Sequence, residues 1–256
     1  MSYKDELFCR NGQVVFSKKE PGYGKIEVRE AIENHELERI LLVDEVRESA
    51  AFMEEGRHYD LVFKYTQDFA IPLQKKPEIQ NTLLLGGAGF SFPKYYIHYY
   101  PEKHIDVVEF KPEMYQLAMQ YFYLDELYRD YNLTENRRLE VFIEDANEYL
   151  KTTDRTYDLI INDCYISNRM DDELLRDEQV KSVKRCLNPG GIYIINLITA
   201  VRGPASMPGI LEYEILNKNF RNTDMFPCKP EMRALEKQNM ILVGTDGEWV
   251  PVDRSR

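Results

Sequence analysis

The chain has 256 residues, 43% of them hydrophobic and 30% charged, and a net charge of −11. This length fits one large domain, or one domain with a small appendage. The negative charge argues against nucleic acid as a partner, because phosphate binding needs a basic surface, and it mildly favours cationic substrates such as amines. No apolar run approaches the ~20 residues that span a bilayer, and residues 1–6 lack the apolar core of a signal peptide. We therefore expect a cytoplasmic protein with no membrane partner.

The four cysteines and four histidines are scattered along the chain. They form neither a Cys-x-x-Cys pair nor a histidine pair on one helix face, which are common spacings of metal ligands. We predict no disulfide framework and no metal.

Residues 1–78 are predicted to form a small β-rich domain, because short segments alternate apolar and polar residues between turn signals. Residues 44–56 have helix or turn character. Residues 59–69 predict a helix with one apolar face. The strands are expected at 13–16, 25–29 and 39–44.

Residues 79–256 alternate strand and helix patterns, which is typical of a parallel sheet with helices on both faces. We therefore predict an α/β fold, with a doubly wound, mostly parallel, Rossmann-like sheet. The strands are expected at 82–85, 105–109, 139–143, 157–163, 192–196, 223–226 and 239–244.

The segment from Thr82 to Glu109 organises this larger domain. The strand at its start ends in a turn of small residues, and the next strand ends in the carboxylate of Glu109. Glycine tolerates positive φ and lets a ligand approach the backbone. A carboxylate about 20 residues after such a turn can accept hydrogen bonds from a ribose diol. The alternatives are a glycine turn without a ligand and a solvated strand end. The small residues of the turn are Gly86, Gly87, Ala88 and Gly89.

Two further carboxylates follow later strands, Asp145 after 139–143 and Asp163 after 157–163. Ligands of open parallel sheets bind at the carboxyl ends of the strands. We therefore expect Glu109, Asp145 and Asp163 to converge with the turn at one edge. Asp145 is otherwise a helix N-cap, and Asp163 is otherwise a plain strand-end residue.

These motifs, with Leu-Asn-Pro-Gly-Gly at 187–191 and Tyr-Gly-Lys-Ile-Glu-Val at 23–28, resemble the class I S-adenosylmethionine-dependent transferases. Within that class the chain is most similar to the spermidine synthase family, over roughly residues 22–244. The N-terminal strands resemble the small β-domain of that family, and a homodimer is possible by analogy.

The resemblance implies roles for individual residues. Glu109 would hold the ribose hydroxyls, Asp145 the adenine amino group, and Asp163 would act as acid/base or orient an amine beside the sulfonium. The turn glycines and Ala146 would also bind the donor. Tyr65, Gln67 and Tyr165 would line the acceptor site.

Two departures from the family pattern affect the expected substrate. The family turn reads Gly-Gly-Gly-Asp-Gly-Gly, and Gly89 stands where its Asp pairs with the ammonium of the aminopropyl donor. Three residues after Asp163, this chain has Ile166 where the family has a second Asp. Each charge-assisted bond to an amine is worth roughly 1.5–3 kcal/mol, so both losses disfavour a diamine complex. Asp171 and Asp172 are possible replacements.

The leading hypothesis is a transferase that uses S-adenosylmethionine to move an alkyl group, with methyl favoured, to a small amine acceptor. The alternative is a genuine aminopropyltransferase, a spermidine synthase, that uses decarboxylated S-adenosylmethionine. A third hypothesis is a non-catalytic nucleoside-binding or partner module, because Phe90 and Phe92 are large enough to fill a donor pocket. An NAD-dependent oxidoreductase ranks last, because it would leave Asp145 and Asp163 unexplained.

Overall fold

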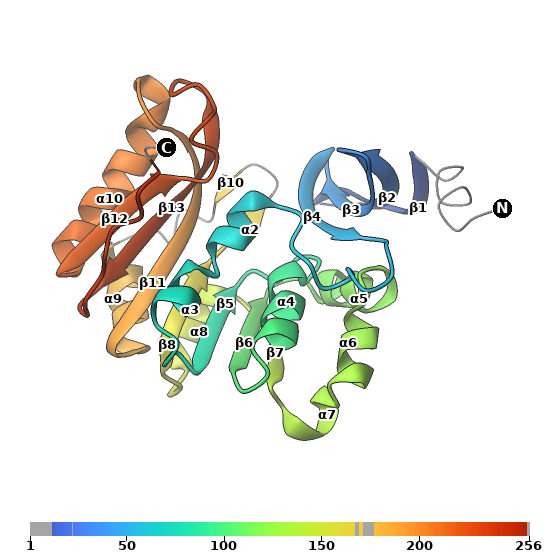
Figure 1. The fold of residues 1–256 in the computed structure, drawn as a ribbon, viewed down its shortest axis with the longest axis horizontal. Coiled ribbons are helices and arrows are strands. Elements are labelled where there is room, and N and C mark those ends of the chain that lie inside the picture. The colour runs from blue at the N-terminus through green and yellow to red at the C-terminus, as the bar shows by residue number, and fades with distance from the viewer. Residues whose placement is uncertain (1–11, 22, 167–168, 171–176, 255–256) are drawn as a thin grey trace.

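The structure is a computed structural model that describes residues 12–21, 23–166, 169–170 and 177–254, without the side chains of 165, 166, 169 and 170. Figure 1 shows a small N-terminal sheet beside a larger sheet that is flanked by helices. The side chain of Tyr165, and Asp171 and Asp172 altogether, lie outside the described residues.

The N-terminal sheet is antiparallel, in the order β1-β2-β3-β4. Two-residue turns at Asn34-His35 and Asp44-Glu45 connect β2 to β3 and β3 to β4, and all four residues have positive φ. Such turns match the twist of a β-hairpin. The predicted helix or turn over 44–56 is therefore wrong, because most of this segment is β4, paired with β3. The strands are β1 Gln13–Glu20, β2 Gly24–Glu33, β3 Glu36–Val43 and β4 Val46–Phe52.

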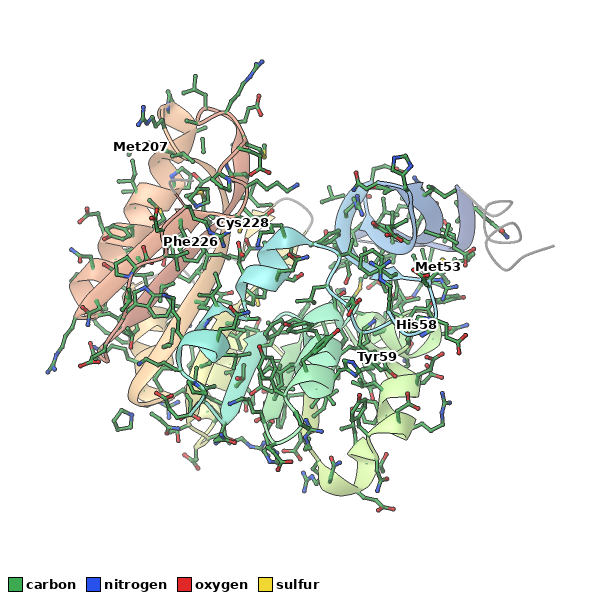
Figure 2. The ribbon with its side chains drawn as sticks, viewed as in Figure 1. Met53, His58, Tyr59, Met207, Phe226 and Cys228 are labelled. Atoms are coloured by element: carbon green, nitrogen blue, oxygen red, sulfur yellow. The ribbon has the colours of Figure 1, made fainter. Side chains whose placement is uncertain are left out.

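The segment between the sheets is held against the larger domain. His58 Nδ1 lies 2.9 Å from Glu126 Oε2, and the Tyr59 hydroxyl donates to Asp130 at 2.8 Å. Figure 2 shows Met53, His58 and Tyr59 along this segment. The predicted helix over 59–69 is confirmed only at its end, as α2 Lys64–Asp68, which is followed by α3 Ile71–Lys75.

The larger sheet has the order β12-β13-β11-β8-β5-β6-β7. The pairs from β11 to β7 are parallel, whereas β13 and β12 join antiparallel. The predicted doubly wound, mostly parallel sheet with a small N-terminal β-sheet is confirmed. Its strands are β5 Asn81–Leu85, β6 His104–Glu109, β7 Leu139–Ile143, β8 Tyr157–Asn162, β11 Leu187–Ala200, β12 Asn222–Pro227 and β13 Lys237–Thr245.

The helices of the larger domain cover both faces of this sheet. Residues alternate between two buried clusters, with Leu84 and Ile161 in one and Leu85 and Ile160 in the other. This alternation is the period-two pattern of a strand that is buried on both faces. The helices are α4 Ser91–Tyr99, α5 Pro112–Tyr121, α6 Leu124–Asp130, α7 Leu133–Asn136, α8 Ala146–Thr152, α9 Asp177–Arg185 and α10 Met207–Asn219, with a 3₁₀ turn η1 Pro204–Ser206 and a short strand pair, β9 Tyr165–Ile166 and β10 Arg169–Met170.

The N-terminal sheet packs on α5, where Ile26, Val28 and Leu41 share a buried cluster with Leu117. This contact places β4 beside the carboxyl ends of β5 and β6. Leu61, as part of the connecting segment, packs into the core of the larger sheet. The division of the chain at residue 78 stays a prediction.

Candidate functional site

The glycine turn follows β5 directly. Gly86 has φ +93°, and a Cβ there would lie 2.5 Å from the carbonyl oxygen of Asp163. Glycine is required at this position because of the positive φ and because a side chain would collide with the Asp163 backbone. The turn and the end of β8 are joined further by the Asp163 amide, which donates to the Leu85 carbonyl at 2.9 Å. The loops after two adjacent parallel strands are thus fixed against each other.

The carboxylate of Glu109 holds the turn from the other side. Its Oε2 accepts from the amides of Gly87 and Ala88 at 2.8 and 3.0 Å, and Oε1 accepts from Lys111 at 2.8 Å. Glu109 is therefore not a solvated strand end. A carboxylate has about four acceptor positions, so one remains on Oε1 for a ligand hydroxyl.

Asp145 is the N-cap of α8. Its Oδ1 accepts from the amides of Asn147 at 2.8 Å and Glu148 at 3.1 Å. The interpretation of Asp145 as a helix cap is confirmed, and it does not exclude ligand binding, because both cap bonds use the same oxygen. Ala146, the first residue of the helix, borders the same cavity as Asp145.

Asp163 lies at the centre of a hydrogen-bond network. Asn196 Nδ2 donates to Asp163 Oδ1 at 2.8 Å, and the Tyr65 side chain also hydrogen-bonds to this carboxylate. Asn239 in turn donates to Asn196 at 3.0 Å. Burial raises the pKa of Asp163 to about 7, against the lowering effect of Asn196 and Tyr65. A carboxyl group with a pKa near neutrality can exchange protons at physiological pH.

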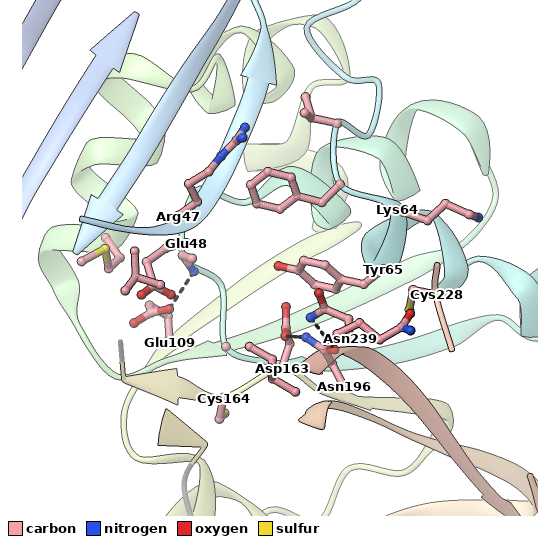
Figure 3. A pocket seen from close by; sticks show the side chains of 18 of the residues that line it. Arg47, Glu48, Lys64, Tyr65, Glu109, Asp163, Cys164, Asn196, Cys228 and Asn239 are labelled. Atoms are coloured by element: carbon pink, nitrogen blue, oxygen red, sulfur yellow. Dashed lines mark hydrogen bonds between the residues drawn. The ribbon is translucent and has the colours of Figure 1, made fainter. Parts of the chain in front are cut away.

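Figure 3 shows these groups around one pocket, and the associated cavity measures about 740 Å³. The cavity lies between the N-terminal sheet and the carboxyl edge of the larger sheet. Its size suits a drug-sized or nucleoside-sized ligand. Its wall includes the predicted residues Tyr65, Gly86, Glu109, Asp145, Ala146 and Asp163.

Three predicted residues do not border this cavity. Gln67 is exposed, and its amide donates to the Leu61 carbonyl at 3.0 Å, outside the described lining of the cavity. Gly87 and Gly89 do not line the cavity, but neighbouring side chains pack closely against both of them. A Cβ on Gly87 would lie 2.8 Å from the Phe90 ring, and one on Gly89 would lie 2.6 Å from Ser49 Oγ.

The phenylalanines beside the turn leave the cavity open. Phe90 and Phe92 are buried in the core of the larger domain and do not line the cavity. The observation that motivated a non-catalytic module is thereby removed.

Sequence reasoning missed two site residues. Asn196 interrupts the apolar run Ile-Ile-Asn-Leu-Ile of β11, and a buried amide in such a run signals a polar partner. Glu48 lies in the segment wrongly predicted as helix or turn, so its place in the wall had no local signal. Burial, with Asp163 and Glu109 nearby, raises the pKa of Glu48 to about 8.

Within the described ranges, no three His, Cys, Asp or Glu side chains are grouped so as to hold a metal ion. No helix in the described part of the chain is long and apolar enough to cross a membrane.

A doubly wound sheet whose glycine turn and strand-end carboxylates border one cavity is the architecture of the class I S-adenosylmethionine-dependent transferases. Comparison with known families is more specific, because residues 63–198 match the spermine/spermidine synthase domain. The match covers more than half of the chain, which therefore belongs to the spermine/spermidine synthase family.

Individual relatives agree with this assignment. The polyamine aminopropyltransferase of Vibrio vulnificus is 28% identical over 139 residues, which are 53% of this chain and 44% of that protein. The polyamine aminopropyltransferase of Prochlorococcus marinus (strain MIT 9301) is 28% identical over 209 residues, 81% of this chain and 67% of that protein. A probable spermidine synthase from Corynebacterium glutamicum has the same fold, with a TM-score of 0.74 and 18% identity over 93% of this chain and 81% of that one.

Proposed function

We propose that this chain is an aminopropyltransferase that moves the aminopropyl group of decarboxylated S-adenosylmethionine to a small amine such as putrescine. Family membership and the names of the relatives support this alternative, and the methyl-transfer hypothesis finds no support among them. The observation that carries the proposal is the wall of the cavity, where Glu48, Glu109 and Asp163 present three carboxylates. Such a wall suits cationic ligands.

The donor site is proposed to lie over the glycine turn. Glu109 would accept a ribose hydroxyl at its remaining position on Oε1. Asp145 would accept from the adenine amino group at Oδ2, since Oδ1 caps the helix. Bound in this way, the donor supplies an electrophilic carbon on its sulfonium.

Asp163 would work on the acceptor amine. The ionised carboxylate accepts a hydrogen bond from the amine and then its proton, while nitrogen forms a bond to the aminopropyl carbon and the carbon–sulfur bond breaks. The electron pair of that bond stays on sulfur, and methylthioadenosine leaves. Asn196 and Tyr65 orient the carboxylate and favour its ionised form.

Purified protein tests the proposal directly. Incubation with decarboxylated S-adenosylmethionine and putrescine should release methylthioadenosine, and S-adenosylmethionine should not replace the decarboxylated donor. The Asp163→Asn variant serves as the control, because it keeps the shape of the side chain and should lose about 10²–10⁴-fold in rate. Turnover with S-adenosylmethionine and none with the decarboxylated donor would refute aminopropyl transfer and return methyl transfer to first place.

A further inference from the structure

Glu48 stands at an irregularity in β4. Leu41 of β3 pairs with Ser49, and the next residue, Leu42, pairs with Arg47, so Glu48 has no partner across the strands. A β-bulge of this kind takes a side chain out of the regular alternation and re-aims it. Ser49 fixes the position, because its hydroxyl lies 2.8 Å from that of Ser91 at the start of α4. The bulge thus directs Glu48 toward the glycine turn and into the cavity, as Figure 3 shows.

The Glu48 carboxylate is incompletely satisfied by the protein. Its Oε1 is buried and has no hydrogen-bond partner in the described part of the chain. Glu109, in contrast, accepts three backbone amides, and Asp163 accepts from Asn196 and Tyr65. A buried acceptor without a donor costs free energy. A ligand that brings a donor to Oε1 recovers that cost.

The charges around Glu48 indicate what kind of hydrogen-bond donor a ligand should bring to Oε1. Asp163 and Glu109 both act on Glu48 as like charges. Among the described residues, eight acidic side chains line the cavity against five basic ones, and two of the basic ones are paired, Lys64 with Asp68 at 2.7 Å and Lys111 with Glu20 at 2.9 Å. Arg47, the neighbour of Glu48, pairs with Glu38 at 2.8 Å. The wall therefore has an excess of negative charge, which a cationic donor relieves.

We propose that Glu48 binds the primary ammonium group of the alkylamine substrate and disfavours substrates that carry a carboxylate beside that amine. This inference rests on the proposed function and names the residue that selects the decarboxylated donor. The turn itself has no space for an acidic side chain, because a Cβ on Gly89 would meet Ser49. β4 provides the carboxylate instead, from the residue next to Ser49. The α-carboxylate of S-adenosylmethionine would meet Glu48 as a like charge.

The test compares ligands with and without the ammonium group. Calorimetric binding of decarboxylated S-adenosylmethionine, S-adenosylmethionine and methylthioadenosine is measured for the wild type and for Glu48→Gln, which keeps the shape and removes the charge. The variant should bind the decarboxylated donor about 10- to 100-fold more weakly. Its affinity for methylthioadenosine, which lacks the ammonium, should stay unchanged and also shows that the fold is intact. S-adenosylmethionine should lose less affinity than its decarboxylated form.

Two variants serve as matched controls. Glu48→Asp keeps the charge and should retain part of the preference for the decarboxylated donor. Glu45→Gln removes an exposed carboxylate in the turn before β4, outside the cavity wall, and should change none of the affinities.

The KM for putrescine separates the two possible sources of the ammonium. A lower donor affinity in Glu48→Gln places the bound ammonium on the donor and supports the proposal, whereas an unchanged donor affinity with a KM raised about tenfold or more places it on the acceptor and overturns donor selection by Glu48. If both the ratio of donor to methylthioadenosine affinity and the KM stay within twofold of wild type, the assignment of Glu48 is overturned. Absence of turnover in the wild type would instead overturn the proposed function, and the binding ratios would still decide the role of Glu48.

Discussion

The hydrogen bond from Asn196 to Asp163 gives a quantitative prediction for the pH dependence of the reaction. The pKa of Asp163 is about 7, so about half of this carboxyl is ionised at pH 7. Asn196→Ala removes a donor to the charged form, worth roughly 1.5–3 kcal/mol, or about one to two pH units. In the proposed reaction Asp163 must be ionised to accept a proton, so the activity of the wild type should rise with pH, and the same rise in the variant should occur at higher pH.

At pH 7 the shift lowers the ionised fraction from about one half to between roughly a tenth and a hundredth, so kcat/KM should fall about 5- to 50-fold. Near pH 9.5 most of the difference should vanish. The assay is methylthioadenosine release at half-unit steps from pH 6 to 10. The ratio of variant to wild type is used because the titration of the acceptor amine cancels in it.

Asn239→Ala is the control, because it removes the donor to Asn196 but keeps the bond from Asn196 to Asp163. It should shift the profile less than Asn196→Ala does. A loss of rate in Asn196→Ala that is equal at every pH would refute the reasoning, since it would show a packing defect without an effect on the proton affinity of Asp163.

Three further predictions concern the turn, the cap and the bulge. Gly86→Ala should lose about 2–4 kcal/mol of unfolding free energy in urea, from positive φ and the contact with the Asp163 carbonyl; a loss under about 0.5 kcal/mol would mean that the turn relaxes easily. Asp145→Ser keeps a capping oxygen whereas Asp145→Ala does not, so only the latter should lose about 1 kcal/mol. Both should weaken methylthioadenosine binding, and wild-type affinity in either would remove Asp145 from the adenine site. Because the pKa of Glu48 is raised, the folded protein without ligand holds this proton more tightly than the unfolded protein does. The unfolding free energy of the wild type should therefore fall relative to that of Glu48→Gln as pH rises from 5 to 9, by up to about 4 kcal/mol. An equal pH dependence of stability in the two proteins would contradict this.

Much of the larger domain follows from its sequence alone. Strands buried on both faces are short apolar runs, and the glycine turn followed by Glu109 predicts a nucleoside site at the carboxyl edge of the sheet from local residue types. The convergence of Glu109, Asp145 and Asp163 also follows, because the carboxyl ends of parallel strands meet at one edge of the sheet. The position of Asp145 as a cap was similarly available from its place before α8.

The tertiary structure alone decided what faces that edge. β4 lacks a clean alternation because the bulge at Glu48 shifts its register, so the segment has no strand signal and its carboxylate has no predicted direction. Tyr65 and Gln67 lie in α2, a helix of only five residues, which is too short for its sequence pattern to show which side chains face the cavity. Tertiary packing directs Tyr65 into the cavity and Gln67 away from it. Residue types along the chain determine which groups can do chemistry, whereas the docking of the N-terminal sheet on α5 determines which of them share a cavity, since contacts between segments far apart in the chain leave no local pattern.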